Sequence, residues 1–258
     1  MIDRFPASSD TRNLCLIVPC YNEASRLDVE SLRRFLCGDF RGHLVFVDDG
    51  SRDNTLQVLE QLQHGYEDRT AILACKPNRG KGEAVRSGIL HALETFEPEI
   101  VGFWDADLAT PLDTVYRFLR VLESHPEIEM VFGSRVKLLG RDVRRRATRH
   151  YLGRVFATAV STMLRLPIYD TQCGAKLFRV ESHTRRLFAD PFLSKWVFDV
   201  EIIARYLQLC NGDPKRVEKV IYEYPLETWI DIAGSKVRPA DFFRAFLDVL
   251  RIRRKYLS

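Results

Sequence analysis

Residues 100–107 read IVGFWDAD, an apolar run that ends in two aspartates separated by one alanine. Isoleucine, valine, phenylalanine and tryptophan dominate the run, a composition typical of a buried strand. In an extended strand end, residues i and i+2 point the same way, so we expect Asp105 and Asp107 to face one ion or one ligand. The stretch therefore predicts a strand of a buried sheet with an acidic site at its carboxyl end.

Four further apolar runs of strand length lie on either side of this one, at residues 14–18, 44–47, 71–74 and 130–132. Helical patterns fill the intervals, at residues 24–36, 54–63, 82–96 and 112–124. Strands that alternate regularly with helices favour a parallel sheet, because each helix returns the chain to the edge where the previous strand began. The sequence therefore predicts an α/β fold with a Rossmann-like, mostly parallel sheet and helices on both faces.

Beyond residue 135 the pattern is less regular, and we expect further helices and strands at residues 144–166, 175–179, 198–209 and 217–224. Pro239 is expected to open a final amphipathic helix that runs to residue 256, because proline fits the first turn of a helix. No repeat, low-complexity linker or clear break divides the chain. We therefore expect a single domain over residues 1–258.

The composition of the 258 residues is that of a globular protein, with 46% hydrophobic and 29% charged residues. The six cysteines include no C-x-x-C pair, which argues against a zinc site or a disulfide framework and favours a reducing cytosol. No uncharged run exceeds ten residues, whereas a helix that spans a bilayer needs about 20 apolar residues. We therefore expect a cytoplasmic protein that can lie on a membrane but cannot cross one.

The net charge of +4 is modest, but the basic residues are clustered. One cluster comprises Arg135, Lys137, Arg141, Arg144, Arg145, Arg146, Arg149 and Arg154, and the C-terminal tail adds Arg251, Arg253, Arg254 and Lys255. Such clusters are either solvated surface or contacts for a membrane or a phosphorylated ligand. The helix predicted at 144–166 leaves the same choice open, between core packing and an interfacial role.

Three predicted strands end in polar clusters: PCYNE at 19–23, DDGS at 48–51 and DAD at 105–107. Ligands of an open parallel sheet bind beyond the carboxyl ends of its strands, where these clusters meet. A surface turn with two acids could explain the third cluster alone, but capping alone does not readily explain three clusters at one edge. Carboxylate oxygens suit Mg²⁺ or Mn²⁺, so we expect one of these ions.

The loop NRGKGE at residues 78–83 joins the third predicted strand to its helix. Its glycines allow a close backbone approach, the helix start offers free N–H groups, and Lys81 or Arg79 adds positive charge. These features indicate a phosphate ligand, although the loop is neither a Walker A motif nor a dinucleotide-binding fingerprint. An acidic site that binds phosphate needs a divalent cation between the two.

Several motifs together carry a resemblance: LIVPCYNE (16–23), VFVDDGSRDNT (45–55), PNRGKGEAVRSG (77–88), FWDADLATP (103–111), GSR (133–135), YDTQCGAKLFR (169–179), WVFDVEI (196–202) and GSKVR (234–238). In this order they resemble the GT-A fold of the large family 2 type of inverting glycosyltransferases. Over residues 12–240 the chain is similar to the polyprenyl-phosphate sugar synthases, especially the dolichyl-phosphate β-glucosyltransferase branch.

The resemblance implies roles for individual residues on the donor side. It implies nucleotide contacts by Pro19, Tyr21, Asn22, Glu23, Asp48, Lys81 and Asp105. It also implies that Asp105 and Asp107 hold a Mg²⁺ or Mn²⁺ ion at the diphosphate, with Asp107 acting in catalysis. Some relatives carry a glutamine as a further metal ligand where this chain has Ala109, so the third ligand is left open. Asp49 is expected to orient its turn.

On the acceptor side the resemblance implies that Arg135 and Arg149 bind a lipid phosphate, with Arg144, Arg145 and Arg146 as possible substitutes. It further implies that Gln172 contacts the sugar or acceptor and that Ser235 and Lys236 belong to a loop that closes over the donor. Asp199 and Glu201 are the candidate general bases if the acceptor is a hydroxyl; otherwise Asp199 organises the arginines or caps a helix. Asp170 is a candidate loop cap.

Taken with these residues, the resemblance implies inverting transfer of a hexose, glucose in the first place, from a UDP-sugar to a polyprenyl phosphate at the cytoplasmic membrane face. Residues 12–135 would form the nucleotide-sugar half and residues 136–258 the acceptor and membrane half; no nucleic-acid partner is expected. A hydroxyl acceptor in a glycan or glycolipid is the alternative within enzymes. A sugar nucleotidyltransferase would need a glycine-rich loop after the first strand, which residues 18–22 lack, and a non-catalytic nucleotide- or membrane-binding protein would not need Asp105 and Asp107.

Overall fold

The computed structural model describes residues 10–144, 147–230 and 239–257. Its central sheet has the strand order β3-β2-β1-β4-β7-β5-β8. The strands are β1 (Leu14–Cys20), β2 (His43–Asp48), β3 (Thr70–Ala74), β4 (Ile100–Trp104), β5 (Met130–Ser134), β7 (Ala175–Arg179) and β8 (Ile221–Pro225). Only β7 runs antiparallel to its neighbours in this sheet, so the prediction of a mostly parallel sheet is confirmed. A separate parallel pair joins β6 (Asp142–Arg144) to β9 (Thr228–Ile230).

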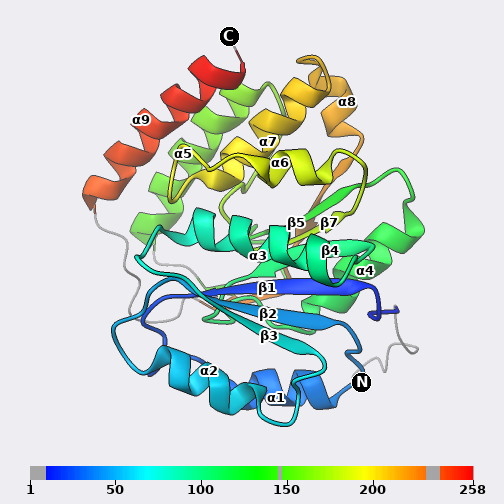
Figure 1. The fold of residues 1–258 in the computed structure, drawn as a ribbon. Helices are drawn as coiled ribbons and strands as arrows, with labels where there is room; N and C mark the ends of the chain where they lie inside the picture. The colour runs from blue at the N-terminus through cyan, green and yellow to red at the C-terminus, as the bar shows by residue number, and fades with distance from the viewer. Residues whose placement is uncertain (1–9, 145–146, 231–238, 258) are drawn as a thin grey trace.

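Helices cover both faces of the sheet, as predicted (Figure 1). One face packs against α1 (Val29–Cys37), α2 (Thr55–Gln63) and α4 (Thr114–Ser124). The other packs against α3 (Lys81–Thr95), α5 (Ala147–Leu164), α6 (Thr184–Ala189), α7 (Phe198–Leu209), α8 (Pro214–Glu218) and α9 (Pro239–Tyr256). Because both faces are covered, the strands are apolar on both sides rather than alternating with polar residues.

The packing of α3 on β1 fixes the position of α3 beside the edge of the sheet where the polar clusters meet. A Cβ added to Gly88 of α3 would lie 2.6 Å from Cγ2 of Ile17 on β1, so a larger residue would push the helix outward. Ile17 is fully buried in the core on this side of the sheet. This close approach determines where the first turn of α3, which carries Lys81, lies relative to the strand ends.

The structure corrects the predicted elements at their least periodic points. The strand predicted at 217–224 begins only at Ile221, because residues 214–218 form α8. Pro214 lies in the first turn of that helix, and the Asp213 side chain accepts a 3.0 Å hydrogen bond from the Lys215 amide. The helix predicted from residue 24 begins instead at Val29. The bounds of β4, α7 and α9 are as predicted.

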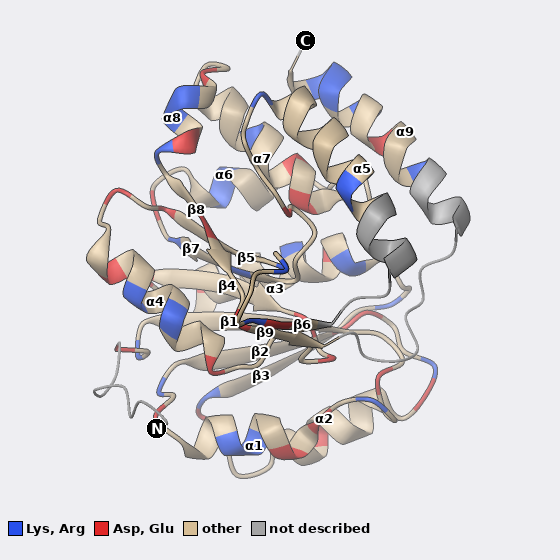
Figure 2. Cartoon of the chain, turned by 180° about the vertical axis from the view of Figure 1, so that it is seen from behind, with Lys and Arg blue, Asp and Glu red and all other residues tan. Residues whose placement is uncertain are grey.

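The described part of α9 combines basic and apolar side chains on its exposed surface. Its last turn carries Arg253, Arg254 and Lys255, and blue segments mark basic residues along the helix in Figure 2. Phe246, Leu247 and Leu250 of the same helix are each more than 40% exposed. In the residues that the structure describes, no helix combines the length and the apolar character that crossing a bilayer requires.

Candidate active site

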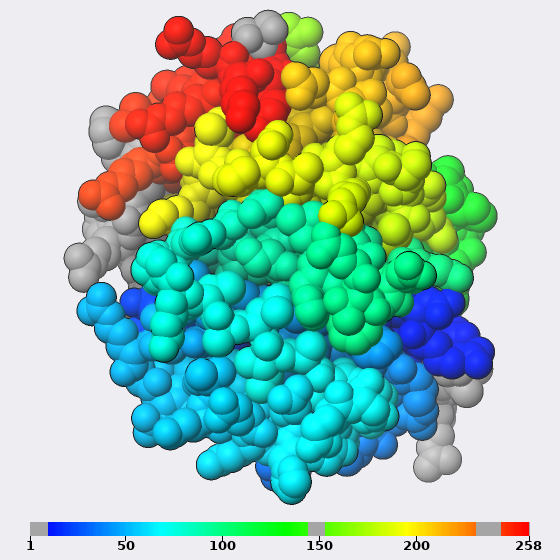
Figure 3. Space-filling view, in the orientation of Figure 1, coloured from blue at the N-terminus to red at the C-terminus, as the bar shows by residue number. Residues whose placement is uncertain are grey.

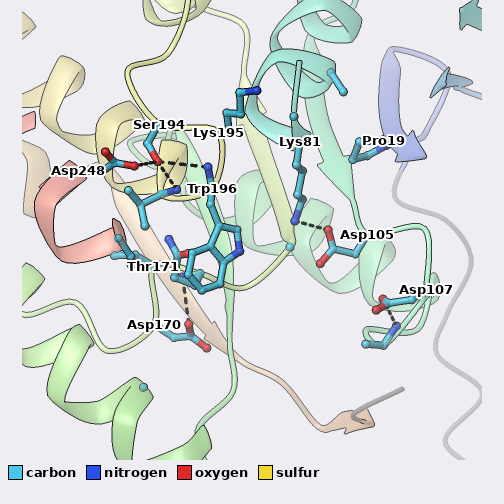
Figure 4. A pocket seen from close by; sticks show the side chains of 18 of the residues that line it. Pro19, Lys81, Asp105, Asp107, Asp170, Thr171, Ser194, Lys195, Trp196 and Asp248 are labelled. Atoms are coloured by element: carbon cyan, nitrogen blue, oxygen red, sulfur yellow. Dashed lines mark hydrogen bonds and ion pairs between the residues drawn. The ribbon is translucent and has the colours of Figure 1, made fainter. Parts of the chain in front are cut away.

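A cavity of about 1100 Å³ opens at the carboxyl ends of β1 and β4. Its walls come from the exits of β1 and β5, the start of α3, the DAD segment after β4 and the loop that leads into β7. One side each of α5 and α9 and the segment before α7 complete the lining. Figure 4 shows side chains from these separate elements pointing toward one another. The polar strand ends identified from the sequence therefore do meet at one edge.

Asp105 and Asp107 both line this cavity, and their carboxylates point to the same side (Figure 4). Asp105 forms an ion pair with the Lys81 ammonium. Asp107 accepts a 3.1 Å hydrogen bond from the Ala109 amide, and its Oδ2 lies 3.7 Å from Nη2 of Arg26. Burial, and after it the negative charge of Asp105, raises the pKa of Asp107. Two neighbouring carboxylates of this kind form a site that favours a cation.

The backbone of the loop that leads into β7 holds Asp105 in place. The Asp105 amide donates a 2.9 Å hydrogen bond to the Gly174 carbonyl. A Cβ added to Gly174 would lie 1.9 Å from Oδ2 of Asp105, closer than any real contact. A residue larger than glycine at position 174 would therefore displace the Asp105 carboxylate.

The residues present fit a divalent cation such as Mg²⁺ or Mn²⁺ in part. Asp105 and Asp107 supply hard oxygen donors that face a cavity. Within residues 10–144, 147–230 and 239–257 no group of three or more His, Cys, Asp or Glu residues could hold a metal ion. The remaining ligands would have to be water and oxygens of a bound phosphate, a mixture that Mg²⁺ commonly accepts.

Lys81 lies in the first turn of α3 and reaches the acidic side of the cavity. Burial alone would lower the pKa of Lys81, but the charges of Asp105 and Asp199 outweigh this effect, so that its pKa is raised. The side chain therefore stays protonated at neutral pH. Its positive charge lies where the sequence predicted a phosphate.

Asp199, like the other candidate general base Glu201, does not line the cavity. Its Oδ1 lies 2.5 Å from Nζ of Lys176, and both side chains are almost fully buried. Lys176 also donates hydrogen bonds to the carbonyls of Thr171 (3.0 Å) and Cys173 (2.5 Å). Burial raises the pKa of Asp199, while Lys176 and Lys81 oppose that shift. The ion pair joins the start of α7 to β7, and the hydrogen bonds of Lys176 tie both to the loop before β7.

Arg135 lines the cavity, but a carboxylate already balances its charge. Its Nε and Nη2 lie 2.6 and 2.8 Å from the two oxygens of Asp170, and its amide donates a third hydrogen bond of 3.1 Å. Burial would lower the pKa of Arg135, and the Asp170 charge more than reverses this, so the pKa is raised. The sequence suggested Asp170 only as a loop cap, because 35 residues separate it from Arg135.

Of the residues expected at the nucleotide, Pro19, Tyr21 and Glu23 line the cavity, as Lys81 and Asp105 do. Asn22 and Asp48 do not. The Asn22 amide donates to Oγ of Ser51 (2.9 Å), and its side-chain oxygen accepts from the Arg52 amide (2.8 Å). Asp48 is buried and accepts from the Ser51 amide at 3.2 Å. Asn22 thus joins the exits of β1 and β2, and Asp48 closes the turn that follows β2.

Asp49 was expected to orient its own turn, but its carboxylate holds the loop before α3 instead. Its carboxylate accepts hydrogen bonds from Nδ2 of Asn78 (2.8 Å) and from the amides of Arg79 (2.8 Å) and Gly80 (2.7 Å). Gly80 has a φ of 96°, in the region that favours glycine. One buried carboxylate thereby holds the glycine loop that ends at Lys81.

The remaining predicted residues lie in different parts of the chain. Gln172 lines the cavity, and its buried Nε2 has no hydrogen-bond partner among the described residues. Arg149 belongs to α5, in a turn whose side chains the structure does not describe. Ser235 and Lys236 lie outside the described residues. Their expected roles stay predictions.

The segment before α7 is a wall of the cavity that the sequence did not indicate. The Ser194 hydroxyl donates to Asp248 of α9 at 2.7 Å and accepts from the Val197 amide at 3.0 Å. In Figure 3 the red C-terminal helix lies against the yellow segment that contains this serine. The hydrogen bond from the Val197 amide to Ser194 closes a local turn ahead of α7, but the aspartate partner of Ser194, 54 residues later, has no sequence signal.

Comparisons with known proteins bear on this geometry. Residues 15–187 match the family described as Glycosyl transferase family 2. The chain is 32% identical over 274 residues to the dolichyl-phosphate beta-glucosyltransferase of Dictyostelium discoideum, which covers 98% of this chain and 80% of that protein. It is 33% identical over 266 residues to the enzyme of the same name from Mus musculus, with 97% and 78% covered.

Two solved structures share the fold at low identity. Glucosyl-3-phosphoglycerate synthase from Mycobacterium tuberculosis, in complex with Mn²⁺ and uridine-diphosphate-glucose, aligns with a TM-score of 0.64 and 17% identity, covering 93% of this chain and 79% of that one. A mannosyltransferase from Pyrobaculum calidifontis, in complex with GDP-Man and Mn²⁺, aligns with a TM-score of 0.61 and 20% identity, covering 95% and 64%. Both show the same arrangement of sheet and helices.

Proposed function

Because the chain belongs to glycosyltransferase family 2, with the GT-A fold, we propose that it transfers glucose from UDP-glucose to a polyprenyl phosphate of the dolichyl type, with inversion at the anomeric carbon. The chain is a glycosyltransferase similar to the dolichyl-phosphate glucosyltransferases. The donor, the acceptor and the action at a membrane are the parts that we propose.

The observation that carries the proposal is the position of Asp105 and Asp107. Both carboxylates face a cavity of about 1100 Å³, beside the protonated Lys81 and the glycine loop. This volume is at the upper end of the usual range for ligand pockets, and a nucleotide sugar needs a large site. Acidic residues next to a lysine suit a metal–diphosphate group better than they suit an uncharged sugar alone.

The chemistry of a phosphate acceptor matches what the chain offers. A phosphate monoester is an anion at neutral pH, so its oxygen attacks the anomeric carbon without losing a proton first. The new C–O bond forms as the bond from carbon to the diphosphate breaks, and the electron pair leaves with UDP. A divalent ion, when bound, would neutralise charge on that leaving group. Asp105 and Asp107 would hold the ion, and Lys81 would add a second positive charge.

A hydroxyl acceptor fits less well. It would need a general base within hydrogen-bond reach of the attacking oxygen. The two candidates, Asp199 and Glu201, are buried in ion pairs with Lys176 and Arg205, and neither lines the cavity. This arrangement favours the phosphate acceptor over the glycan or glycolipid hydroxyl.

We also propose that the protein acts at the cytoplasmic face of a membrane, where a polyprenyl phosphate is located. The support is the described surface of α9, on which exposed Phe246, Leu247 and Leu250 accompany the basic last turn. Apolar side chains beside cationic ones are suited to an anionic lipid surface. Flotation with anionic liposomes tests this: binding at low salt that fades at high salt is expected, and no binding at low salt refutes it.

Product analysis with the purified chain tests the transfer. It is incubated with radiolabelled UDP-glucose, Mg²⁺ or Mn²⁺, and either polyprenyl phosphate in detergent or a panel of saccharides and glycolipids. We expect radiolabel in the lipid fraction with polyprenyl phosphate and its loss with a chelator. Transfer to hydroxyl acceptors with none to a phosphate acceptor would refute the proposal, and release of glucose 1-phosphate on addition of pyrophosphate would indicate a nucleotidyltransferase instead.

A further inference from the structure

The cations that line the cavity differ in whether a carboxylate balances them. They are Arg26, Lys81, Arg135, Arg154, Lys195, Arg244 and Arg251. Four of the seven form ion pairs: Arg26 with Glu23 and Asp107, Lys81 with Asp105, Arg135 with Asp170, and Arg251 with Asp248. Among the described residues, Arg154, Lys195 and Arg244 have no carboxylate partner. A ligand that carries two negative charges is drawn most strongly to such uncompensated cations.

Of these three residues, Arg154 is the one held in place. Lys195 and Arg244 are exposed, and long exposed side chains lose much rotamer freedom when they bind. Arg154, on α5, is partly buried, and its Cζ lies 3.8 Å from the centroid of the Tyr169 ring. Stacking on an aromatic face leaves the edge of a guanidinium, with its N–H groups, available to another partner. Its geometry is therefore set before any ligand arrives.

The stacking partner is itself fixed by the sheet. The amides of Tyr169 and Asp170 donate 2.8 Å hydrogen bonds to the two carboxylate oxygens of Glu223 on β8. Tyr169 supports Arg154, and its neighbour Asp170 holds Arg135. Residues 169 and 170, held by Glu223, thus position two arginines of the cavity. A carboxylate balances the charge of Arg135, whereas the charge of Arg154 has no such partner among the described residues.

We infer that Arg154 binds the phosphate group of the acceptor. A planar guanidinium can donate two hydrogen bonds to two oxygens of one phosphate, and these bonds are stronger than those of a neutral donor. Arg135, whose charge Asp170 balances, also holds the loop, and its expected contact with the phosphate stays a prediction. The inference rests on the proposed function, because it assumes that the acceptor is a phosphate ester, whether lipid-linked or free.

The test compares Arg154→Gln with Arg154→Lys in steady-state kinetics. Loss of a charge-assisted pair of hydrogen bonds is expected to raise the acceptor KM by about 10- to 100-fold in Arg154→Gln. The KM for UDP-glucose and the kcat at saturating acceptor should stay within about twofold of wild type. Arg154→Lys keeps the positive charge but loses the two parallel N–H donors of the guanidinium, so an intermediate acceptor KM is expected. A merely structural role would not move the acceptor KM alone.

The control variant is Arg216→Gln, which removes the same charge from an exposed position on α8 outside the cavity. It should leave both KM values unchanged. If Arg154→Gln does not fold, Tyr169→Leu removes the stacking platform and should raise the acceptor KM by a smaller factor. An acceptor KM within twofold of wild type in the folded Arg154 variants overturns the inference.

Two acceptors separate the phosphate from its lipid. Polyprenyl phosphate in micelles and a water-soluble short isoprenyl phosphate should show the same relative rise in KM, because both carry the group that Arg154 binds. A rise confined to the long-chain lipid would overturn the inference in favour of a membrane contact. Wild-type protein that transfers glucose to neither acceptor would refute the proposed function itself, which distinguishes the two failures.

Discussion

The contact between Gly174 and Asp105 permits a demanding test of the site. In Gly174→Ala the new methyl group would lie 1.9 Å from Oδ2 and 2.1 Å from Cγ of Asp105. To reach an ordinary contact of 3.4 Å, the carboxylate must retreat by about 1.5 Å. A misplacement of about 1 Å in a catalytic group can lower the rate about 100-fold. We therefore expect kcat to fall by about 100-fold or more.

The assay measures kcat and both KM values as Mn²⁺ is varied, together with the melting temperature. The displaced Asp105 should also weaken binding of Mn²⁺, seen as a smaller thermal shift on addition of the ion to the protein without substrate. Gly65→Ala is the control, because Gly65 has open space around it but a φ of 89°. That variant should lower the melting temperature and leave kcat unchanged. Wild-type kcat and metal dependence in folded Gly174→Ala would refute the reasoning.

Three further predictions concern the buried charges. Asp107→Asn should lower kcat by about 100-fold or more, since it removes one of the two proposed metal ligands; unchanged turnover in the radiolabel assay would contradict this. Because the pKa of Asp107 is raised in the folded protein, ionisation of its carboxyl destabilises the metal-free fold as pH rises through that pKa. Without metal at neutral pH, Asp107→Asn should therefore have a higher melting temperature than wild type. A lower melting temperature would contradict this prediction. Lys176→Met should cost about 3–5 kcal/mol in urea unfolding, because Asp199 would be left as a buried unpaired charge, whereas a double variant with Asp199→Leu should recover part of that loss.

Local sequence signals were sufficient to bring Asp105, Asp107 and Lys81 to one edge of the sheet, whereas Asn22 and Asp48 do not line the cavity. The apolar run before Asp105 identifies a buried strand, and the DAD spacing places both carboxylates on one side. The glycine loop before Lys81 shows the start of a helix. Each of these signals lies within a few residues of the feature it predicts, so the sequence alone carries the information.

The acceptor side depends on pairs that are distant in the sequence. Arg135 and Asp170 are 35 residues apart, and Ser194 and Asp248 are 54 apart. Whether a carboxylate balances an arginine depends on contacts between distant parts of the chain, so no local pattern distinguishes Arg135 from Arg154. The short helices α6 and α8 were missed for a related reason, since five or six residues contain too few turns to show periodicity.

The insertion of β7 between β4 and β5 bears on how the chain reaches its native state. Among the strands that the structure describes, β5 bonds to β7 and β8 alone, and both come from later in the chain than residue 135. During synthesis the strands β3-β2-β1-β4 would therefore leave the ribosome first, and β5 would stay unpaired until β7 and β8 had been synthesised. Such late, long-range pairing slows folding and leaves an open strand edge vulnerable to association with other chains. A fragment that stops at residue 135 should consequently aggregate rather than form an autonomous nucleotide-binding module.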